Sequence, residues 1–289
     1  MPEDYLITLL SNEKKIHGYI AILKNTAISL QKSHSMNIIS SAIFSRALVG
    51  GVLLSGNLKN KCDTLSLRWN CNGPAKSIFI EANGNGEVKG YIGENNLKLI
   101  EKSISDNSIL SEPYIGFGEL TFTRNSSFSK APYNSLTVIE TGEIAEDISL
   151  HLQQSLQIES ALKIGLAIDN NNNIETCGGI LFMAMPNCTN EEIKALKKAF
   201  DGVVSLTDIL KKSDDNLNSI IEHFKPLDLE IISKRNINFY CNCNILKIKN
   251  ILKSLKKEDL QEYLSETGKI EASCQYCGKK YFFNESNLE

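Results

Sequence analysis

The sequence Cys241-Asn-Cys243, followed after residues 244–273 by Cys274-Gln-Tyr-Cys277 and a glycine, decides the fold of the C-terminal part of the chain. Residues two apart on an extended strand point to the same side, so the first two cysteines can face one ion. The second pair has the spacing of a zinc knuckle, in which a tight turn brings two sulfurs together and the following glycine permits a strained backbone angle. The pattern predicts one zinc ion bound by four cysteines.

Four sulfur ligands complete a tetrahedron and leave no open position for a substrate water, which indicates a structural metal site and not a hydrolytic one. The alternative is that these cysteines are buried thiols or form structural disulfides. Two closely spaced pairs in a chain without secretory features favour zinc. The remaining cysteines show no ligand spacing and are predicted to be small buried side chains: Cys62, Cys71, Cys177 and Cys188.

The composition bounds the class of protein. With 289 residues the chain is long enough for about two domains with a substantial core. It is 42% hydrophobic and 22% charged, with a formal net charge of −3. A mildly acidic chain has no global field that attracts nucleic acid, so binding of this kind would have to be local.

The N-terminal sequence indicates a cytoplasmic protein. It begins Met1-Pro-Glu-Asp4 and leads to no basic segment followed by an apolar run, so we expect no signal peptide and reduced cysteines. Residues 36–54 approach the length of a membrane span, but Arg46 lies near their middle and polar residues dilute them. A buried core helix is the better interpretation, and no membrane association is expected.

The first part of the chain mixes the periodicities of strands and helices, which predicts an α+β fold. Residues 83–86, Asn-Gly-Asn-Gly, are typical of a hairpin turn. Strands are predicted at 18–23, 65–71, 77–82, 88–92, 120–123, 135–140, 161–168 and 174–185. Helices are predicted at 38–54 and 144–156.

The sequence pattern changes after residue 187 to that of short amphipathic helices. Thr189 and Glu192 have the spacing of a capping box and precede an amphipathic helix, and two more short helices are predicted at 205–212 and 217–224. Such helices are individually marginal and need a partner surface.

From Phe239 onward the sequence predicts a small module around the four cysteines. Residues 245–255 and 258–264 have helical spacing, and short strands are expected at 269–274 and 281–283. A segment with so few large apolar side chains has little core, so metal ligation should supply much of its folding free energy.

Motifs for catalysis are weak, and we expect no enzyme. Gly51 and Gly56 have the glycine spacing of a phosphate loop, but Asn57 and Leu58 stand where lysine and serine or threonine are needed. The histidines are scattered and no nucleophile elbow occurs, although a Ser-His-Asp site assembled only in space stays open.

Two further alternatives concern the cysteine module. Its lysines suit either a zinc-ribbon that contacts nucleic acid or a solvated face that offsets the charge of four thiolates, and the acidic chain favours the second: Lys247, Lys249, Lys253, Lys256, Lys257, Lys279 and Lys280. The C-x-x-C pair is also found in thiol oxidoreductases, but here it does not lie in a βαβ unit.

The chain resembles the heat shock protein 33 family, the redox-regulated holdase chaperones of bacteria. The resemblance is most specific in Phe239-Tyr-Cys-Asn-Cys243 and in residues 268–283, Gly-Lys-Ile-Glu-Ala-Ser-Cys-Gln-Tyr-Cys-Gly-Lys-Lys-Tyr-Phe-Phe. Supporting motifs are Asn72-Gly-Pro74, Lys89-Gly-Tyr91, the helix at 141–156 and Gly178-Gly-Ile-Leu-Phe-Met-Ala-Met-Pro186. The family usually has serine where this chain has Asn244 and arginine at Lys89, and the linker matches poorly.

The resemblance implies a chaperone core at 1–187, a helical linker at 188–238 and a C-terminal redox switch at 239–289. It also implies that Cys241, Cys243, Cys274 and Cys277 bind zinc when reduced, and form the disulfides Cys241–Cys243 and Cys274–Cys277 when oxidised.

Oxidation would then release zinc, unfold the switch and the linker, and expose apolar surface to unfolding client proteins without ATP. A homodimer is implied for the active form. The candidate client-binding residues are the apolar stripes of the linker: Ile193, Leu196, Phe200, Leu217, Ile220, Ile221 and Phe224.

Overall fold

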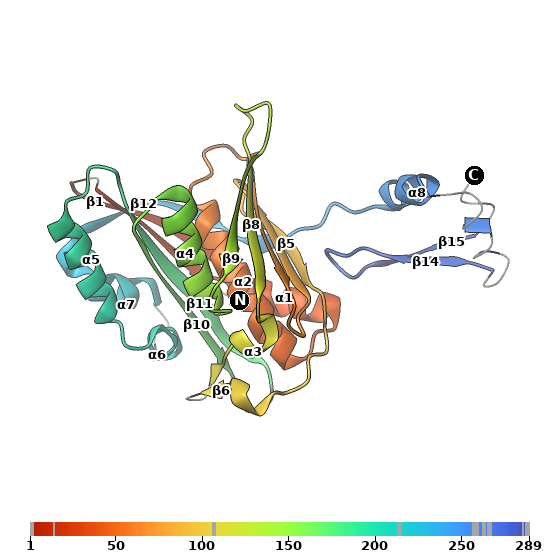
Figure 1. The fold of residues 1–289 in the computed structure, drawn as a ribbon, viewed down its shortest axis with the longest axis horizontal. Helices are drawn as coiled ribbons and strands as arrows, with labels where there is room; N and C mark the ends of the chain where they lie inside the picture. Colours follow the sequence, from red (N-terminus) through yellow and green to blue (C-terminus); the bar gives the residue numbers. More distant parts are fainter. Residues whose placement is uncertain are drawn as a thin grey trace. The chain divides into compact units, whose positions relative to one another are not determined.

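The computed structural model describes residues 3–13, 15–105, 108–212, 216–255, 260–261, 264, 268–284 and 286. The chain forms two compact units, Met1–Phe239 and Tyr240–Glu289, which we call unit 1 and unit 2. Among the described residues, unit 1 contains two large β-sheets, one two-stranded sheet and several helices, and unit 2 contains helix α8 and a β-hairpin (Figure 1). The predicted mixture of sheets and helices is confirmed.

A five-stranded sheet, which we call the first sheet, has the order β10-β11-β2-β1-β12 with antiparallel neighbours. The strands predicted at 161–168 and 174–185 are confirmed as β10 and β11, which form a hairpin. Its turn is closed by the side chain of Asp169, which accepts hydrogen bonds from the backbone of Asn171 and Asn173. The strands are β1 Tyr5–Ser11, β2 Ile16–Ile22, β10 Ser160–Ile168, β11 Ile174–Ala184 and β12 Leu229–Asn236.

A six-stranded sheet has the order β13-β5-β4-β3-β8-β9, in which only the short β13 pairs in parallel. The strand predicted at 65–71 is confirmed as β3, and its apolar residues Leu65, Leu67 and Trp69 are all buried on one face. At the predicted β4–β5 turn, Gly86 has a φ of 90°, which favours glycine. The strands are β3 Thr64–Cys71, β4 Ser77–Asn83, β5 Glu87–Ile92, β8 Gly118–Asn125, β9 Tyr133–Ile139 and β13 Asn238–Phe239.

Helix α2, Ile38–Ser55, forms the centre of the larger core and contacts both β11 and β4. It is apolar and long enough to cross a membrane, but 89% of it is buried inside unit 1, as predicted. A Cβ atom on Gly51 would lie 2.6 Å from Ile80 Cγ2, so this glycine serves helix-to-sheet packing and not phosphate binding.

The other helices before β10 contribute buried side chains to the same core as α2. The predicted helix around residue 150 is α4, and its Ile144, Ile148 and Leu152 are buried. The other elements are helices α1 Lys24–His34, α3 Glu112–Ile115 and α4 Ile144–Leu156, the 3-10 helix Glu101–Ser103, and the short strands β6 Ile104–Ser105 and β7 Ser108–Ile109.

Three helices cover one face of the first sheet (Figure 1). The predicted capping box begins α5, because the Thr189 hydroxyl accepts from the Glu192 N–H while the Glu192 carboxylate accepts from the Thr189 N–H. The elements are α5 Asn190–Asp201, α6 Leu206–Lys212, α7 Asn216–His223 and the 3-10 helix Lys225–Leu227.

Strand β12 lies in the segment 188–238 and is not predicted from the sequence. Its sequence, Leu-Glu-Ile-Ile-Ser-Lys-Arg-Asn, lacks apolar alternation, and most of its side chains are exposed. Backbone pairing with β1 holds it in the sheet, so tertiary context overrides the local pattern.

Unit 2 contains α8 Ile245–Lys253 and the hairpin of β14 Ile270–Ser273 and β15 Lys280–Phe283. These elements confirm the predicted helix and both strands. Most of the helix expected at 258–264 lies outside the described residues.

Candidate metal centre

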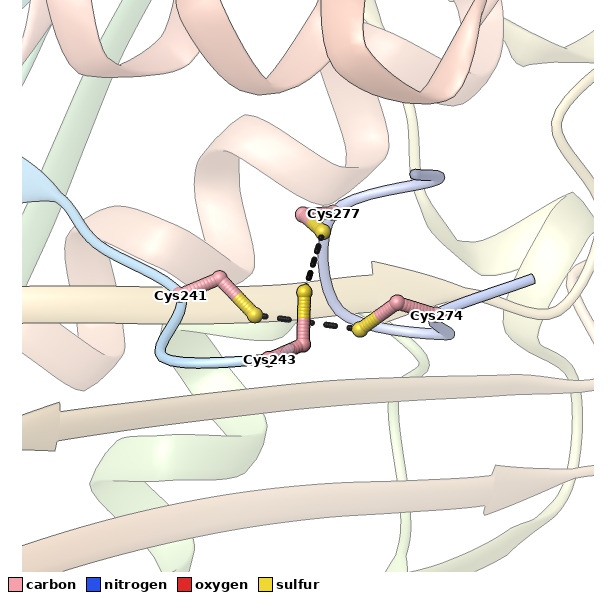
Figure 2. A group of neighbouring side chains, drawn as sticks. All are labelled: Cys241, Cys243, Cys274 and Cys277. Carbon is pink, nitrogen blue, oxygen red and sulfur yellow. Dashed lines mark hydrogen bonds between the residues drawn. The ribbon is translucent and has the colours of Figure 1, made fainter. Parts of the chain in front are cut away.

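The four cysteines reach the site from two segments of unit 2. Cys241 and Cys243 lie in the irregular segment before α8, and Cys274 and Cys277 lie at either end of the turn between β14 and β15. Figure 2 shows their sulfur atoms directed toward one another. The turn is closed by a hydrogen bond from the Gly278 N–H to the Cys274 carbonyl at 2.8 Å, and Gly278 has a φ of 68°.

The spacing of the sulfur atoms suits a tetrahedral metal ion. All four Sγ atoms lie within 4.8 Å of one another. The Sγ atoms of Cys241 and Cys274 are 3.7 Å apart, and those of Cys243 and Cys277 are 3.4 Å apart. Zinc–sulfur bonds of about 2.3 Å at tetrahedral angles separate two sulfurs by about 3.8 Å. The cluster is therefore able to hold a metal ion of zinc's size and preference.

The pKa shifts of the cysteine thiols favour a bound cation at this cluster. Burial raises the pKa of the Cys241 and Cys277 thiols. Burial would also raise the pKa of Cys243, but hydrogen bonds from Tyr281 and from the other cysteines outweigh it and lower this pKa to about 7. Cys241 and Cys277 therefore resist ionisation on their own, whereas a bound divalent ion would stabilise the ligating sulfurs as thiolates.

Unit 2 has a small apolar core around the cysteines. Among the residues of unit 2 that the structure describes, the buried side chains of this core are Leu252, Ile270, Cys274, Tyr281 and Phe283. So small a core stabilises a fold weakly, and ligation of a metal would add the free energy that is missing.

Two polar contacts shape the surroundings of the first cysteine pair. The Tyr281 hydroxyl donates to Cys243 Sγ at 3.1 Å. Asn244 caps α8 by accepting from the Lys247 N–H at 2.9 Å, so the positive end of this helix lies next to the cysteines. The Tyr281 contact has no sequence pattern, whereas the asparagine directly before the predicted helix at 245–255 is a typical N-cap residue, a signal that the prediction of this helix did not use.

The lysines of unit 2 are largely engaged within the unit. Lys247 donates to the Asn242 carbonyl, Lys280 pairs with Glu271 at 2.6 Å, and the Lys279 ammonium lies 5.4 Å from the centroid of the Tyr281 ring. These contacts favour a charge-balancing role over a nucleic-acid surface. Lys256 and Lys257 lie outside the described residues.

Most of the apolar side chains predicted to bind clients are turned toward the first sheet. Leu196, Phe200, Ile220 and Phe224 are buried, and Ile193, Leu217 and Ile221 are partly buried. All but Ile193 belong to one apolar cluster with Ile7, Leu9, Ile16, Ile20, Ile180 and Phe182 of the sheet. The rings of Phe182 and Phe224 are in contact, with centroids 4.7 Å apart. In this state the stripes are covered, and so is the sheet face beneath them.

Two lysines that lie outside α5, Lys15 and Lys163, contact the two ends of this helix. The sequence did not indicate these contacts. At the first turn, the Lys15 ammonium lies 2.6 Å from the Glu192 carboxylate. At the last turn, the Lys163 ammonium of β10 donates to the carbonyl oxygens of Phe200 and Val203. Their partners are far away in the sequence, so no local motif reveals them.

The free cysteines and histidines show no catalytic arrangement among the described residues. The prediction that the other four cysteines are buried holds for Cys177, whereas Cys71 and Cys188 are only partly buried. It is wrong for Cys62, which is exposed because it lies in the turn before β3. The ring nitrogens of His151 bond to the hydroxyls of Ser135 and Thr137, both at 2.9 Å. A hydroxyl therefore occupies the place that a carboxylate takes in a Ser-His-Asp triad.

The chain is similar to known proteins over nearly its whole length. The family model described as Hsp33 protein matches residues 4–284. A protein of Lactobacillus johnsonii named 33 kDa chaperonin is 30% identical over 287 residues, which are 99% of this chain and 97% of the relative. A protein of Geobacter sulfurreducens with the same name is 28% identical over 287 residues, 99% of this chain and 94% of the relative.

A solved structure has the same fold. The crystal structure of the 33 kDa chaperonin (heat shock protein 33 homolog) from Thermotoga maritima matches with a TM-score of 0.89. The match covers 99% of this chain and 97% of that one, at 23% sequence identity. At this identity the likeness establishes the architecture alone.

Proposed function

The chain belongs to the Hsp33 family of chaperones, which are not enzymes, and we propose that it is a redox-regulated holdase that works without ATP. The reduced, metal-bound form is inactive. In this proposal residues 1–187 are the chaperone core, 188–238 the linker and 239–289 the redox switch. The four-cysteine cluster in a unit with little core of its own is the observation that carries the proposal.

We propose zinc as the metal, one ion per chain, held by Cys241, Cys243, Cys274 and Cys277. An all-sulfur tetrahedral set favours zinc among the common divalent ions. When bound, zinc holds the four sulfurs as thiolates and ties the segment before α8 to the β14–β15 turn.

Oxidation by a peroxide would remove the ligands. One thiolate attacks a peroxide oxygen, becomes a sulfenic acid and releases hydroxide; a second thiolate then displaces the sulfenic hydroxyl group and forms a disulfide. Each disulfide takes two electrons from the sulfurs, and each peroxide is reduced to water. The proposed pairs are Cys241–Cys243 and Cys274–Cys277. The first closes a loop with a single intervening residue, so we expect it to be strained and easily reduced.

Loss of the ligands would unfold unit 2, because its own core is small. Strands β12 and β13 connect the linker helices to the first cysteines along the chain. We propose that this segment and the helices α5 to α7 then detach. Detachment would expose the apolar stripes of the linker and the apolar face of the first sheet.

The partners in this proposal are unfolding or oxidatively damaged proteins. The exposed stripes present aliphatic and aromatic side chains without a shaped polar pocket, which suits promiscuous apolar binding. The candidate contacts are Ile193, Leu196, Phe200, Leu217, Ile220, Ile221 and Phe224. We propose that the active form is a homodimer and that the protein works in the cytoplasm, where reduced thiols are maintained.

The proposal is tested by following zinc and chaperone activity together. Zinc release is measured with a colorimetric chelator, and aggregation of a thermally unfolding client by light scattering, before and after peroxide treatment at mild heat. We expect oxidation to release zinc and to suppress aggregation. The proposal fails if the reduced protein suppresses aggregation equally well, or if oxidation releases no zinc.

A further inference from the structure

One hydroxyl group is directed at one of the four sulfurs. The Tyr281 Oη donates a hydrogen bond to Cys243 Sγ at 3.1 Å. Tyr281 lies on β15 opposite Ala272 of β14, and its side chain is only 7% exposed. The hairpin register and the small core of unit 2 therefore hold this hydroxyl beside the sulfur.

The position of the hydroxyl affects reaction with an oxidant more than it affects binding of a metal. A thiolate attacks a peroxide through a sulfur lone pair, and a hydrogen bond to the sulfur occupies lone-pair density and lowers its nucleophilicity. A metal-bound thiolate keeps further lone pairs, so the same hydrogen bond is compatible with ligation and orients the ligand.

We infer that Tyr281 shields Cys243 from oxidation and thereby raises the peroxide concentration at which the switch opens. This inference rests on the proposed function and assigns a regulatory residue to the same site. The chemistry is the thiolate oxidation described above, with the peroxide as the oxidant. Tyr281 is a positioning residue, because it acts on the oxidant only through the sulfur that accepts its hydrogen bond.

The matched variants differ from the wild type by one oxygen atom. Tyr281→Phe removes the hydroxyl and keeps the ring in the core of unit 2. Tyr240→Phe is the control, because Tyr240 lies beside the same site but is 48% exposed. Both are compared with the wild type as full-length, reduced, zinc-loaded proteins. Zinc content is measured first, and the rates of zinc release are then measured in peroxide and, separately, in a chelator without oxidant.

We expect Tyr281→Phe to release zinc at least about threefold faster in peroxide, since a hydrogen bond to a charged sulfur carries enough free energy for this change. Time-resolved alkylation and mass spectrometry should show Cys243 lost earlier than in the wild type. Release into the chelator should change less than release in peroxide, and Tyr240→Phe should follow the wild type in both.

Three results would overturn the inference. They are equal peroxide rates for Tyr281→Phe and wild type, an equal acceleration in chelator and peroxide, and loss of zinc from the variant before any oxidant is added. The last two would show that the hydroxyl stabilises the fold or the metal and does not shield the sulfur. If the wild type itself releases no zinc in peroxide, the proposed function fails instead.

Discussion

The ammonium group of Lys163 donates a hydrogen bond to the backbone carbonyl oxygen of Phe200 at 2.8 Å, and so joins strand β10 to the last turn of helix α5. The carbonyls of the last helical turn carry partial negative charge, so a cation is favourable there, and the Phe200 carbonyl also accepts from the Val203 N–H at 3.2 Å. The same ammonium lies 5.2 Å from the centroid of the Phe200 ring. Lys163 therefore contacts both the backbone and the side chain of Phe200 at the end of α5.

Replacement of this lysine tests how firmly the linker is held. Lys163→Met keeps the aliphatic stem and removes the donor, which we expect to weaken docking of α5 by about 1–3 kcal/mol. Hydrogen exchange of the α5 amides in the reduced protein should become faster. The control is Lys197→Met, which breaks an exposed pair with Glu159 that should contribute about 0–1 kcal/mol. Unchanged exchange in Lys163→Met would contradict a clamping role.

The aromatic contact between linker and sheet gives a second test. Phe224 is 1% exposed and packs against Phe182, so Phe224→Ala should destabilise the docked linker by about 3–5 kcal/mol. We expect the reduced variant to suppress client aggregation without oxidant, because the apolar sheet face is uncovered. Val204→Ala, at a side chain that is 94% exposed, is the control and should stay inactive when reduced. A reduced Phe224→Ala protein that remains as inactive as wild type would refute linker release as the activating step.

The buried histidine predicts how the stability of unit 1 depends on pH. Burial lowers the pKa of His151 to about 4, whereas an unfolded chain has a histidine pKa of about 6.5. Above pH 6.5 neither state binds the proton, and this group leaves the free energy of unfolding unchanged. As the pH falls from 6.5 to 4, the unfolded chain binds a proton that the folded chain excludes, so stability falls by up to about 3 kcal/mol.

The measurement uses the single tryptophan of the chain, Trp69, which is fully buried in unit 1. Urea unfolding is followed by its fluorescence at pH 7 and pH 5 in wild type and His151→Gln. The loss of stability at pH 5 should be smaller in the variant, since glutamine does not titrate. His223→Gln, at an exposed histidine, should behave as the wild type. An equal loss in His151→Gln and wild type would show that other groups cause the pH dependence.

Local patterns were sufficient to predict much of the fold. Strand alternation in β3, the Asn-Gly turn before β5 and the capping box of α5 each depend on neighbours within a few residues. The four cysteines were recognised from the sequence for the same reason, because they occur as two closely spaced pairs. Their meeting in one cluster follows from the hairpin and from the segment before α8.

The rest depends on contacts between distant residues. Strand β12 exists because β1 offers it a hydrogen-bonding edge, and its own sequence carries little apolar alternation. The bond from Lys163 to Phe200 and the hydrogen bond from Tyr281 to Cys243 join side chains whose types are common everywhere. Only the folded chain distinguishes these from ordinary surface lysines and core tyrosines.

Metal removal should unfold unit 2 and leave the large apolar core around α2 intact, because the apolar core of unit 2 is much smaller. We expect a strong chelator at neutral pH, with a reductant present, to abolish hydrogen-exchange protection of the β14–β15 amides while the fluorescence of Trp69 stays unchanged. Cys274→Ser should produce the same state without chelator, and Cys62→Ser, at an exposed cysteine outside the cluster, should retain one zinc per chain. If the hairpin amides remain protected after the metal is gone, the small apolar core is sufficient to fold unit 2. Loss of the metal on oxidation would then not unfold unit 2, and this step of the proposal would fail.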